Sequence, residues 1–173
     1  MSDSRLEEKK IIYRKYDIIW YLLTFIIVVF LDQTSKLIAK KNLDYTYCTF
    51  FLKFSPIINH GIAFGLFSNS SILNQYILSF FSIIALSLLF YIFIRKYFLD
   101  KNGFVELLVI SASFSNILDR YLYGGIIDFI TINFIHIVFP IGNIADIIIV
   151  FGIGYIMFKF YYDSEKFLED EIF

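Results

Sequence analysis

Long apolar segments that contain no charge alternate with short polar segments along this chain. Residues 18–31 form an apolar run of 14 residues, and residues 72–94 form a second run of 23 residues that ends at Arg95 and Lys96. A helix needs about 20 mainly apolar residues to cross the hydrocarbon core of a bilayer. The pattern therefore predicts a membrane protein built mainly from α-helices.

Four segments can cross a membrane as helices, at about 17–39, 72–94, 104–121 and 140–159. The first continues its helical pattern through Asp32 and Lys36, and no small-residue cleavage site follows it, which argues against a removable signal peptide. The third has an uncharged centre of only 12 residues, so we expect its polar ends to lie at an interface or inside the bundle. Pro140 suits the start of the fourth helix.

The segment between the first two helices has a different composition. Residues 42–71 are rich in Tyr, Phe and Thr, with turn residues at Ser55-Pro56, at 59–61 and at 68–70. Residues 45–54 have the aromatic and β-branched content that is typical of a strand. We therefore expect a small β-element outside the bilayer, with its aromatic rings at the membrane interface.

The distribution of basic residues indicates which side of the membrane the chain ends occupy. Four spans put the tails at 1–16 and 160–173 on one side and the segments 42–71 and 122–139 on the other. The tails, the helix ends beside them and the 95–103 loop hold ten Lys and Arg residues, against five on the opposite side. By the positive-inside rule, the tails are cytoplasmic, and the β-element and a loop at 122–139 are extracytoplasmic. We expect a single membrane domain.

The composition agrees with a membrane location and limits the functions to consider. The 173 residues are 58% hydrophobic and 21% aromatic, with a mean hydropathy of +0.70, which is too apolar for a soluble domain of this size. The net charge is −1, and no long basic tract suggests a nucleic-acid partner. Cys48 is the only cysteine, which excludes an internal disulfide and any CxxC motif.

Polar and ionisable side chains gather at one end of the predicted bundle. Charge is costly at membrane depth, so each such residue is a functional candidate. The predicted topology places them all near the outer leaflet surface, which indicates one site. They are Asp32 in the first helix, Asn116, Asp119 and Arg120 in the third, Asn143 and Asp146 in the fourth, and Asp128 in the loop between the last two.

Two pairs among these residues have the i,i+4 spacing that places side chains on one helix face. Asp32 and Lys36 form the first pair, which can be an ion pair that anchors the helix at the membrane interface. Asn116 and Arg120 form the second, with Asp119 beside them. Arg120 can pair with Asp119 at the membrane surface, or its five donors can bind a carboxylate, a phosphate headgroup or a peptide carbonyl.

Asp128 and Asp146 suggest a specific chemistry. Two carboxylates in one poorly solvated site cannot both ionise easily, so they share a proton. One can act as a general base on water while the other acts as a general acid on a carbonyl oxygen, as in an aspartic protease. The alternatives are proton relay, cation binding and, for Asp146, a charge that complements the start of a helix.

Metal chemistry has little support in the sequence. The histidines are His60 and His136, and no HExxH motif is present, so we expect no metal and no cofactor. Asn59 and Gly61 offer an amide and a bare backbone that can hold an extended peptide through main-chain hydrogen bonds. The simpler alternative is a turn before the second span.

Four motifs, taken together, resemble the lipoprotein signal peptidase family, also called signal peptidase II. Their order and spacing agree with the family, and the resemblance extends from about residue 17 to residue 160. Gly142 departs from the pattern, because Phe is usual there, and 111–115 replaces a usual glycine-rich stretch. The motifs are LDQTSK at 31–36, NHGIAFGLF at 59–67, NILDR at 116–120 followed by GIIDF at 125–129, and FPIGNIAD at 139–146.

This resemblance implies an intramembrane aspartic endopeptidase that removes signal peptides from prolipoproteins, just before a cysteine already modified with diacylglycerol. The catalytic aspartates of the family match Asp128 and Asp146. It also implies a β-cradle within 42–71 and an amphipathic helix near 125–139. The supporting polar residues of the family match Asp32, Lys36, Asn59, Gly61, Asn116, Arg120 and Asn143.

The implied enzyme acts in the bacterial inner membrane, with its active site near the outer leaflet. Its partners are diacylglyceryl-modified prolipoproteins and membrane lipids, and we expect a monomer. The alternative function is a small proton- or ion-coupled carrier that uses the same carboxylates. A carrier predicts a site near the bilayer midplane and often internal repeats, and the sequence shows no repeat.

Overall fold

Four helices dominate the part of the chain that the computed structural model describes, which is residues 3–42, 46–49, 52–61, 71–134, 137–138 and 140–172. The helices are α1 (Asp3–Lys40), α2 (Ile72–Phe98), α3 (Phe104–Tyr123) and α4 (Ile144–Ile172). The segments predicted as tails are helical where the structure describes them, because α1 begins at Asp3 and α4 continues to Ile172; their cytoplasmic location stays a prediction. Glu, Lys and Leu in both segments favour helix, and neither segment contains Pro or Gly to end one.

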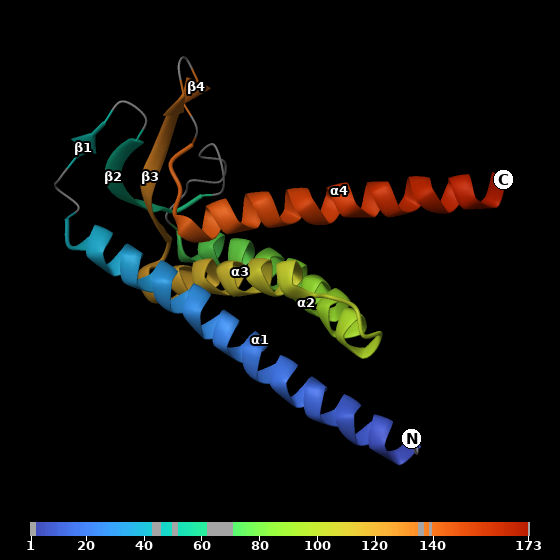
Figure 1. Cartoon of the computed structure of the whole chain (residues 1–173). Helices are drawn as coiled ribbons and strands as arrows, with labels where there is room; N and C mark the ends of the chain where they lie inside the picture. The colour runs from blue at the N-terminus through green and yellow to red at the C-terminus, as the bar shows by residue number, and fades with distance from the viewer. Residues whose placement is uncertain are drawn as a thin grey trace.

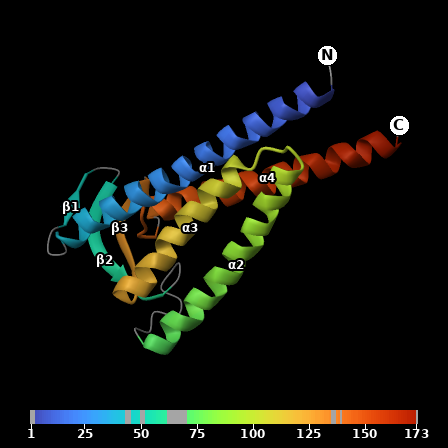
Figure 2. The same cartoon turned by 90° about the horizontal axis from the view of Figure 1, so that it is seen from below.

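The helix α3 is the centre of the bundle, since it packs against each of the other three helices. Figure 2 shows α3 crossing between α1, α2 and α4. Ser111, Ala112 and Ser115 of α3 are completely buried. Small side chains at these positions allow close approach of the neighbouring helix backbones.

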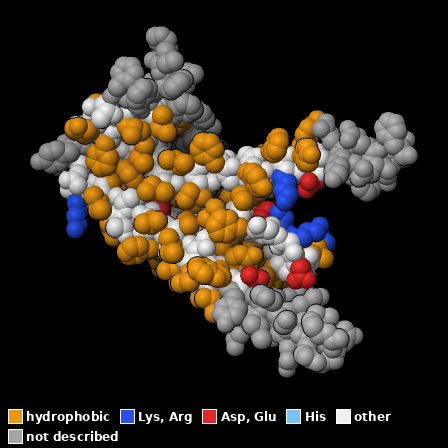
Figure 3. Space-filling model, viewed as in Figure 1, with side chains coloured by type: hydrophobic (Ala, Val, Ile, Leu, Met, Phe, Trp, Pro, Cys, Tyr) orange, Lys and Arg blue, Asp and Glu red, His pale blue; other side chains and the backbone are white. Residues whose placement is uncertain are grey.

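Both chain ends lie at one end of the bundle, and the sheet lies at the other (Figure 1). Hydrophobic side chains cover much of the described surface, whereas many of the charged ones gather at the helix ends nearest the termini (Figure 3). Three described segments are long and apolar enough to cross a membrane: Asp17–Lys40, Ile72–Phe98 and Ile144–Ser164. The α3 helix carries three charged residues in its 20, Glu106, Asp119 and Arg120, so composition alone does not mark it as a span.

The β-element is an antiparallel sheet with the strand order β1-β2-β3-β4. Its strands are β1 (Tyr47–Cys48), β2 (Leu52–Asn59), β3 (Ile126–Phe134) and β4 (Ile137–Val138). The predicted strand at 45–54 is therefore split into parts of two strands. The turn predicted at Ser55-Pro56 was wrong, because both residues lie inside β2. The register shifts between Phe54 and Ile57, and such a bulge accommodates a proline that cannot donate a ladder hydrogen bond.

The predicted loop at 122–139, and the amphipathic helix near 125–139, were wrong for Ile126–Phe134, which form the strand β3. β3 pairs with β2 along most of its length, from Leu52 opposite Ile132 to Asn59 opposite Ile126. Its β-branched and aromatic residues suit a half-buried strand. The pairing partner is about 70 residues earlier in the chain, which local patterns do not reveal.

A tight return from α3 into β3 places the strand against β2. Gly124 ends α3 in the left-handed conformation, with φ at 68°, which glycine adopts without steric cost. A Cβ atom on Gly125 would lie 2.9 Å from the backbone oxygen of Asn59. The first glycine therefore makes the return possible, and the second permits a close approach of two backbones.

Candidate active site

Asp128 and Asp146 are brought together by Asn143, which contacts both carboxylates. The side-chain nitrogen of Asn143 donates to Oδ1 of Asp128 at 2.8 Å, and its backbone N–H donates to Oδ2 of Asp146 at 3.2 Å. Asp128 lies near the start of β3 and is 1% exposed, whereas Asp146 lies in the first turn of α4 and is half-buried. Two predicted site residues from separate elements therefore share one location.

Two further amides complete the contacts of these carboxylates. Asn59 Nδ2 donates to Oδ2 of Asp128 at 2.8 Å, and Asn116 Nδ2 donates to Oδ1 of Asp146 at 2.9 Å. Each of the four carboxylate oxygens thus accepts a hydrogen bond. Asn59, Asn116 and Asn143, predicted as supporting residues, hold the two carboxylates in fixed orientations.

The position of Asp146 follows from how α4 begins. Asn143 Oδ1 accepts the N–H of Asp146 at 2.9 Å while the Asp146 carboxylate accepts the N–H of Asn143, which is a reciprocal capping arrangement. The predicted helix start at Pro140 was wrong, because Gly142 instead exchanges backbone hydrogen bonds with Ile130 of β3. This pairing holds the residues before α4 beside β3, and it thereby places Asp146 near Asp128.

The Asp128 carboxyl has an unusual proton affinity. Its pKa is raised from the ordinary value of 3.8 to about 7, first because the group is buried and second because Asp146 lies close. Hydrogen bonds from Asn59 and Asn143 and the positive charge of Lys36 lower the pKa, but they do not cancel the effect of burial. Asp128 is therefore able to hold or release a proton near neutral pH.

Lys36 lies at the centre of a buried polar network next to the two carboxylates. Its ammonium nitrogen is 2.6 Å from Asp32, 2.9 Å from Asp119 and 2.6 Å from Oδ1 of Asn116. The predicted pairing of Asp32 with Lys36 is confirmed. The pair is not an anchor at the membrane interface. Lys36, Asp32 and Asp119 are completely buried, so the network is internal.

Asp32 connects three helices through its two oxygens. Besides the ion pair to Lys36 within α1, it accepts Ser115 Oγ of α3 at 2.7 Å and the N–H of Ala145 of α4 at 2.9 Å. Ala145 directly precedes Asp146. Asp32 therefore contributes to the position of Asp146 without contacting it.

Arg120 does not form the surface ion pair with Asp119 that the sequence suggested. In the described structure Asp119 pairs with Lys36, and Arg120 donates to Oε1 of Gln75 at 2.8 Å and to the carbonyl of Gly61 at 2.6 Å. Asp119 also accepts Gln33 Nε2 and the N–H of Ile127. The carbonyl of Gly61 accepts from Arg120 and its N–H donates to Asn59 Oδ1, so its predicted role in holding a peptide stays a prediction.

Sequence reasoning missed Gln33, Gln75 and Ser115. Gln33 donates to Ser115 and Asp119, and Gln75 binds Arg120. All three lie in or beside segments that the apolar pattern marked as spans. An amide or hydroxyl inside such a segment needs a partner, which was the available signal.

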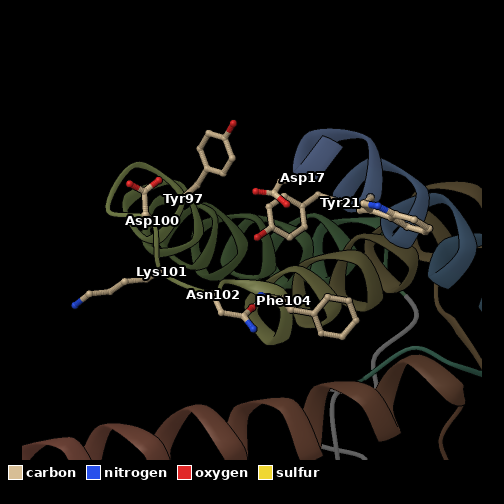
Figure 4. A pocket seen from close by; sticks show the side chains of 8 residues that line it. Asp17, Tyr21, Tyr97, Asp100, Lys101, Asn102 and Phe104 are labelled. Atoms are coloured by element: carbon tan, nitrogen blue, oxygen red, sulfur yellow. Dashed lines mark hydrogen bonds between the residues drawn. The ribbon is translucent and has the colours of Figure 1, made fainter. Parts of the chain in front are cut away.

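A separate hollow lies beside the start of α3, at the end away from Asn116 and Arg120 (Figure 4). None of the predicted site residues lines it, so it is distinct from the two carboxylates. Among the described side chains, no three His, Cys, Asp or Glu residues are placed to hold a metal ion. The hollow is lined by Asp17, Trp20, Tyr21, Tyr97, Asp100, Lys101, Asn102 and Phe104.

Comparison with known proteins gives a consistent result. The sequence pattern of the family described as signal peptidase (SPase) II matches residues 24–162. The lipoprotein signal peptidase of Chlamydia pneumoniae is 32% identical over 159 residues, covering 84% of this chain and 92% of that protein. That of Thermodesulfovibrio yellowstonii is 33% identical over 141 residues, covering 79% and 91%. A solved bacterial membrane enzyme is 28% identical and superposes with a TM-score of 0.71 over 84% of this chain and 90% of its own.

Proposed function

Because the chain belongs to the signal peptidase II family and acts as a lipoprotein signal peptidase, we propose that it is an aspartic endopeptidase whose catalytic groups are Asp128 and Asp146. The observation that carries this proposal is the meeting of the two carboxylates through Asn143. Each carboxylate oxygen is oriented by an amide, and one carboxyl has a pKa near 7. A shared proton at neutral pH is what an aspartic dyad requires.

In the proposed resting state the proton resides on Asp128. This carboxyl is 1% exposed, and burial disfavours its charged form. Asp146 is half-buried in the first turn of α4, where the N-terminal end of a helix favours negative charge. The asymmetry assigns the initial acid to Asp128 and the initial base to Asp146.

The reaction then needs two proton transfers in each half. In the first half, the Asp146 carboxylate removes a proton from water while the water oxygen bonds to the scissile carbonyl carbon. At the same time Asp128 gives its proton to the carbonyl oxygen. In the second half, Asp146 passes its proton to the leaving nitrogen as the carbon–nitrogen bond breaks. Asp128 recovers a proton from the hydroxyl as the new carboxyl forms. The groups return to their starting states, and water is the only reagent consumed besides the substrate.

The substrate proposed for this site is a prolipoprotein, cut just before a cysteine that carries diacylglycerol. The support is the function of the family. The exposed apolar surface of the helices suits contact with the acyl chains of the lipidated substrate.

The proposed location is the bacterial inner membrane, with four spans, both termini in the cytoplasm and the active site near the outer leaflet. The excess of Lys and Arg at the end nearest the termini supports this orientation, and both termini lie opposite the sheet (Figure 1). The alternative function as a proton- or ion-coupled carrier is not supported, because the relatives are peptidases.

Cleavage of a lipidated precursor tests the function directly. The purified protein in detergent micelles is expected to cleave a diacylglyceryl-modified prolipoprotein and to leave the unlipidated precursor uncut over the same time. Gel separation of precursor and product, with mass spectrometry of the new N-terminus, measures both. Equal cleavage of the two precursors would refute the proposed substrate, and a cut elsewhere than before the cysteine would refute the proposed bond.

The rate of cleavage is expected to fall as the pH rises above about 7. The dyad needs one proton, and Asp128 loses its proton through a pKa of about 7. Initial rates between pH 5 and 9, on protein shown to remain folded, should therefore decline by up to tenfold per unit on the alkaline side. A rate that stays constant to pH 9 would contradict a shared proton on Asp128.

The same pKa fixes the sign of a stability effect. Between about pH 4 and pH 7 the folded Asp128 binds more protons than the unfolded chain, so the free energy of unfolding falls as the pH rises through this window. The slope is up to about 1.4 kcal/mol per pH unit for one group. Comparison of wild type with Asp128→Asn isolates this contribution, because only the wild type retains it.

A further inference from the structure

Gln75 is a buried amide near the start of α2 that lies outside every motif singled out in the sequence. It is 6% exposed and uses both ends of its side chain. Nε2 donates to the carbonyl of His60 at 2.6 Å, and Oε1 accepts Nη1 of Arg120 at 2.8 Å. One side chain therefore connects α2 to α3 and to the turn after β2.

Gln75 and Arg120 hold two consecutive carbonyls. Arg120 Nη2 donates to the carbonyl of Gly61 at 2.6 Å, while Gln75 donates to that of His60. A nitrogen of the His60 ring lies 2.8 Å from the carbonyl of Gly124 on the other side of the turn. The turn is thus fixed by buried or half-buried groups from two helices and from the return before β3.

The fixed turn determines which way the Asn59 amide faces. Oδ1 of Asn59 accepts the N–H of Gly61 at 2.9 Å, so its Nδ2 is left to donate to Asp128 at 2.8 Å. The contact between Asn59 and Asp128 thus depends on where the Gly61 backbone lies. Gln75 acts on that position directly at His60 and indirectly through Arg120.

We propose that Gln75 is a positioning residue for peptide cleavage, holding the His60–Gly61 turn so that Asn59 donates to Asp128. This inference rests on the proposed aspartic mechanism and adds a residue of α2 to it. Gln75 touches neither catalytic carboxylate, so its effect passes through Asn59. The chemistry explains why an amide is needed, since the position requires one donor and one acceptor.

Two substitutions separate the two ends of this amide. Gln75→Glu keeps an acceptor for Arg120 but cannot donate to His60 when ionised. Gln75→Met has similar length and offers neither a donor nor a comparable acceptor. Tyr76→Phe, at the neighbouring exposed position of α2, is the matched control.

Cleavage of the lipidated precursor should distinguish these variants. Gln75→Met is expected to lower kcat by about 10- to 100-fold with a smaller change in KM, and Gln75→Glu to lower it less. The alkaline limb of the pH–rate profile should move to higher pH in Gln75→Met, because Asp128 loses a donor that favours its ionised form. Tyr76→Phe should match wild type in both measurements.

Each outcome decides between the possible roles. A lower kcat with an unmoved alkaline limb would show a general loss of structure and overturn the positioning role, as would full activity in Gln75→Met. If Gln75→Met does not fold, the same two measurements on Gln75→Glu decide the question. A wild-type protein that cleaves no lipidated precursor would overturn the proposed function itself, which differs visibly from a defect confined to the Gln75 variants.

Discussion

Asp128→Asn and Asp146→Asn are each expected to lower the rate of prolipoprotein cleavage by at least about 10³-fold, which is within the range that positioned acid–base groups contribute. An amide occupies nearly the same volume as a carboxyl but cannot take or release the proton that the mechanism moves. The two carboxylates act as a unit through Asn143. The double variant should therefore be little worse than either single one.

This result has meaning only if the variants fold. Both should purify as wild type does and show thermal unfolding in micelles at a similar temperature. Asp163→Asn is the matched control, because Asp163 is an exposed carboxylate in the last third of α4 and should keep full activity. A folded Asp128→Asn or Asp146→Asn protein with more than a tenth of the wild-type rate would exclude that residue from catalysis.

Lys36→Met is expected to cause the largest loss of stability of any single substitution considered, about 3–5 kcal/mol. Methionine has a similar length but no charge, so it leaves Asp32 and Asp119 without the positive partner that they now have. Both carboxylates are completely buried. An uncompensated buried charge is costly because the interior cannot replace water around it. Thermal unfolding in micelles should show a decrease of roughly 6–20 °C for a chain of this size.

Lys40→Met provides the comparison one helical turn later. Lys40 is half-buried and lies over the ring of Tyr123, with its nitrogen 3.7 Å from the ring centroid. Loss of such a contact costs about 1 kcal/mol or less. Adding Asp119→Asn to Lys36→Met should recover part of the stability, since one of the unpaired charges is removed. Similar unfolding temperatures for the Lys36 and Lys40 variants would contradict the role assigned to Lys36.

The sequence was most informative where the structure is local. An apolar run forms a buried or lipid-facing helix wherever it occurs, so the four helices lie close to their predicted positions. Asp32 and Lys36 pair because four residues along a helix bring two side chains together.

The predictions that failed concern partners that lie far apart in the chain. Arg120 faces Gln75, 45 positions away, and not the adjacent Asp119. Residues 126–134 form a strand because β2 supplies its hydrogen bonds, and periodicity within the segment does not show this. Pro140 does not start α4, because backbone pairing of Gly142 with β3 delays the helix to Ile144.

By itself, the sequence determined a helical membrane protein with two carboxylates, Asp128 and Asp146, as its best candidates for chemistry. Charge at membrane depth is costly wherever it occurs, so the polar residues of the site stand out without any knowledge of the fold, and the resemblance to the family selects these two among them. Only the tertiary structure decided that Lys36 is an internal hub, that Asn143 joins the two carboxylates, and that Gln75 belongs to the site. Those roles depend on hydrogen bonds between residues 15 to 80 positions apart, whose geometry exists only after the helices and the sheet have packed.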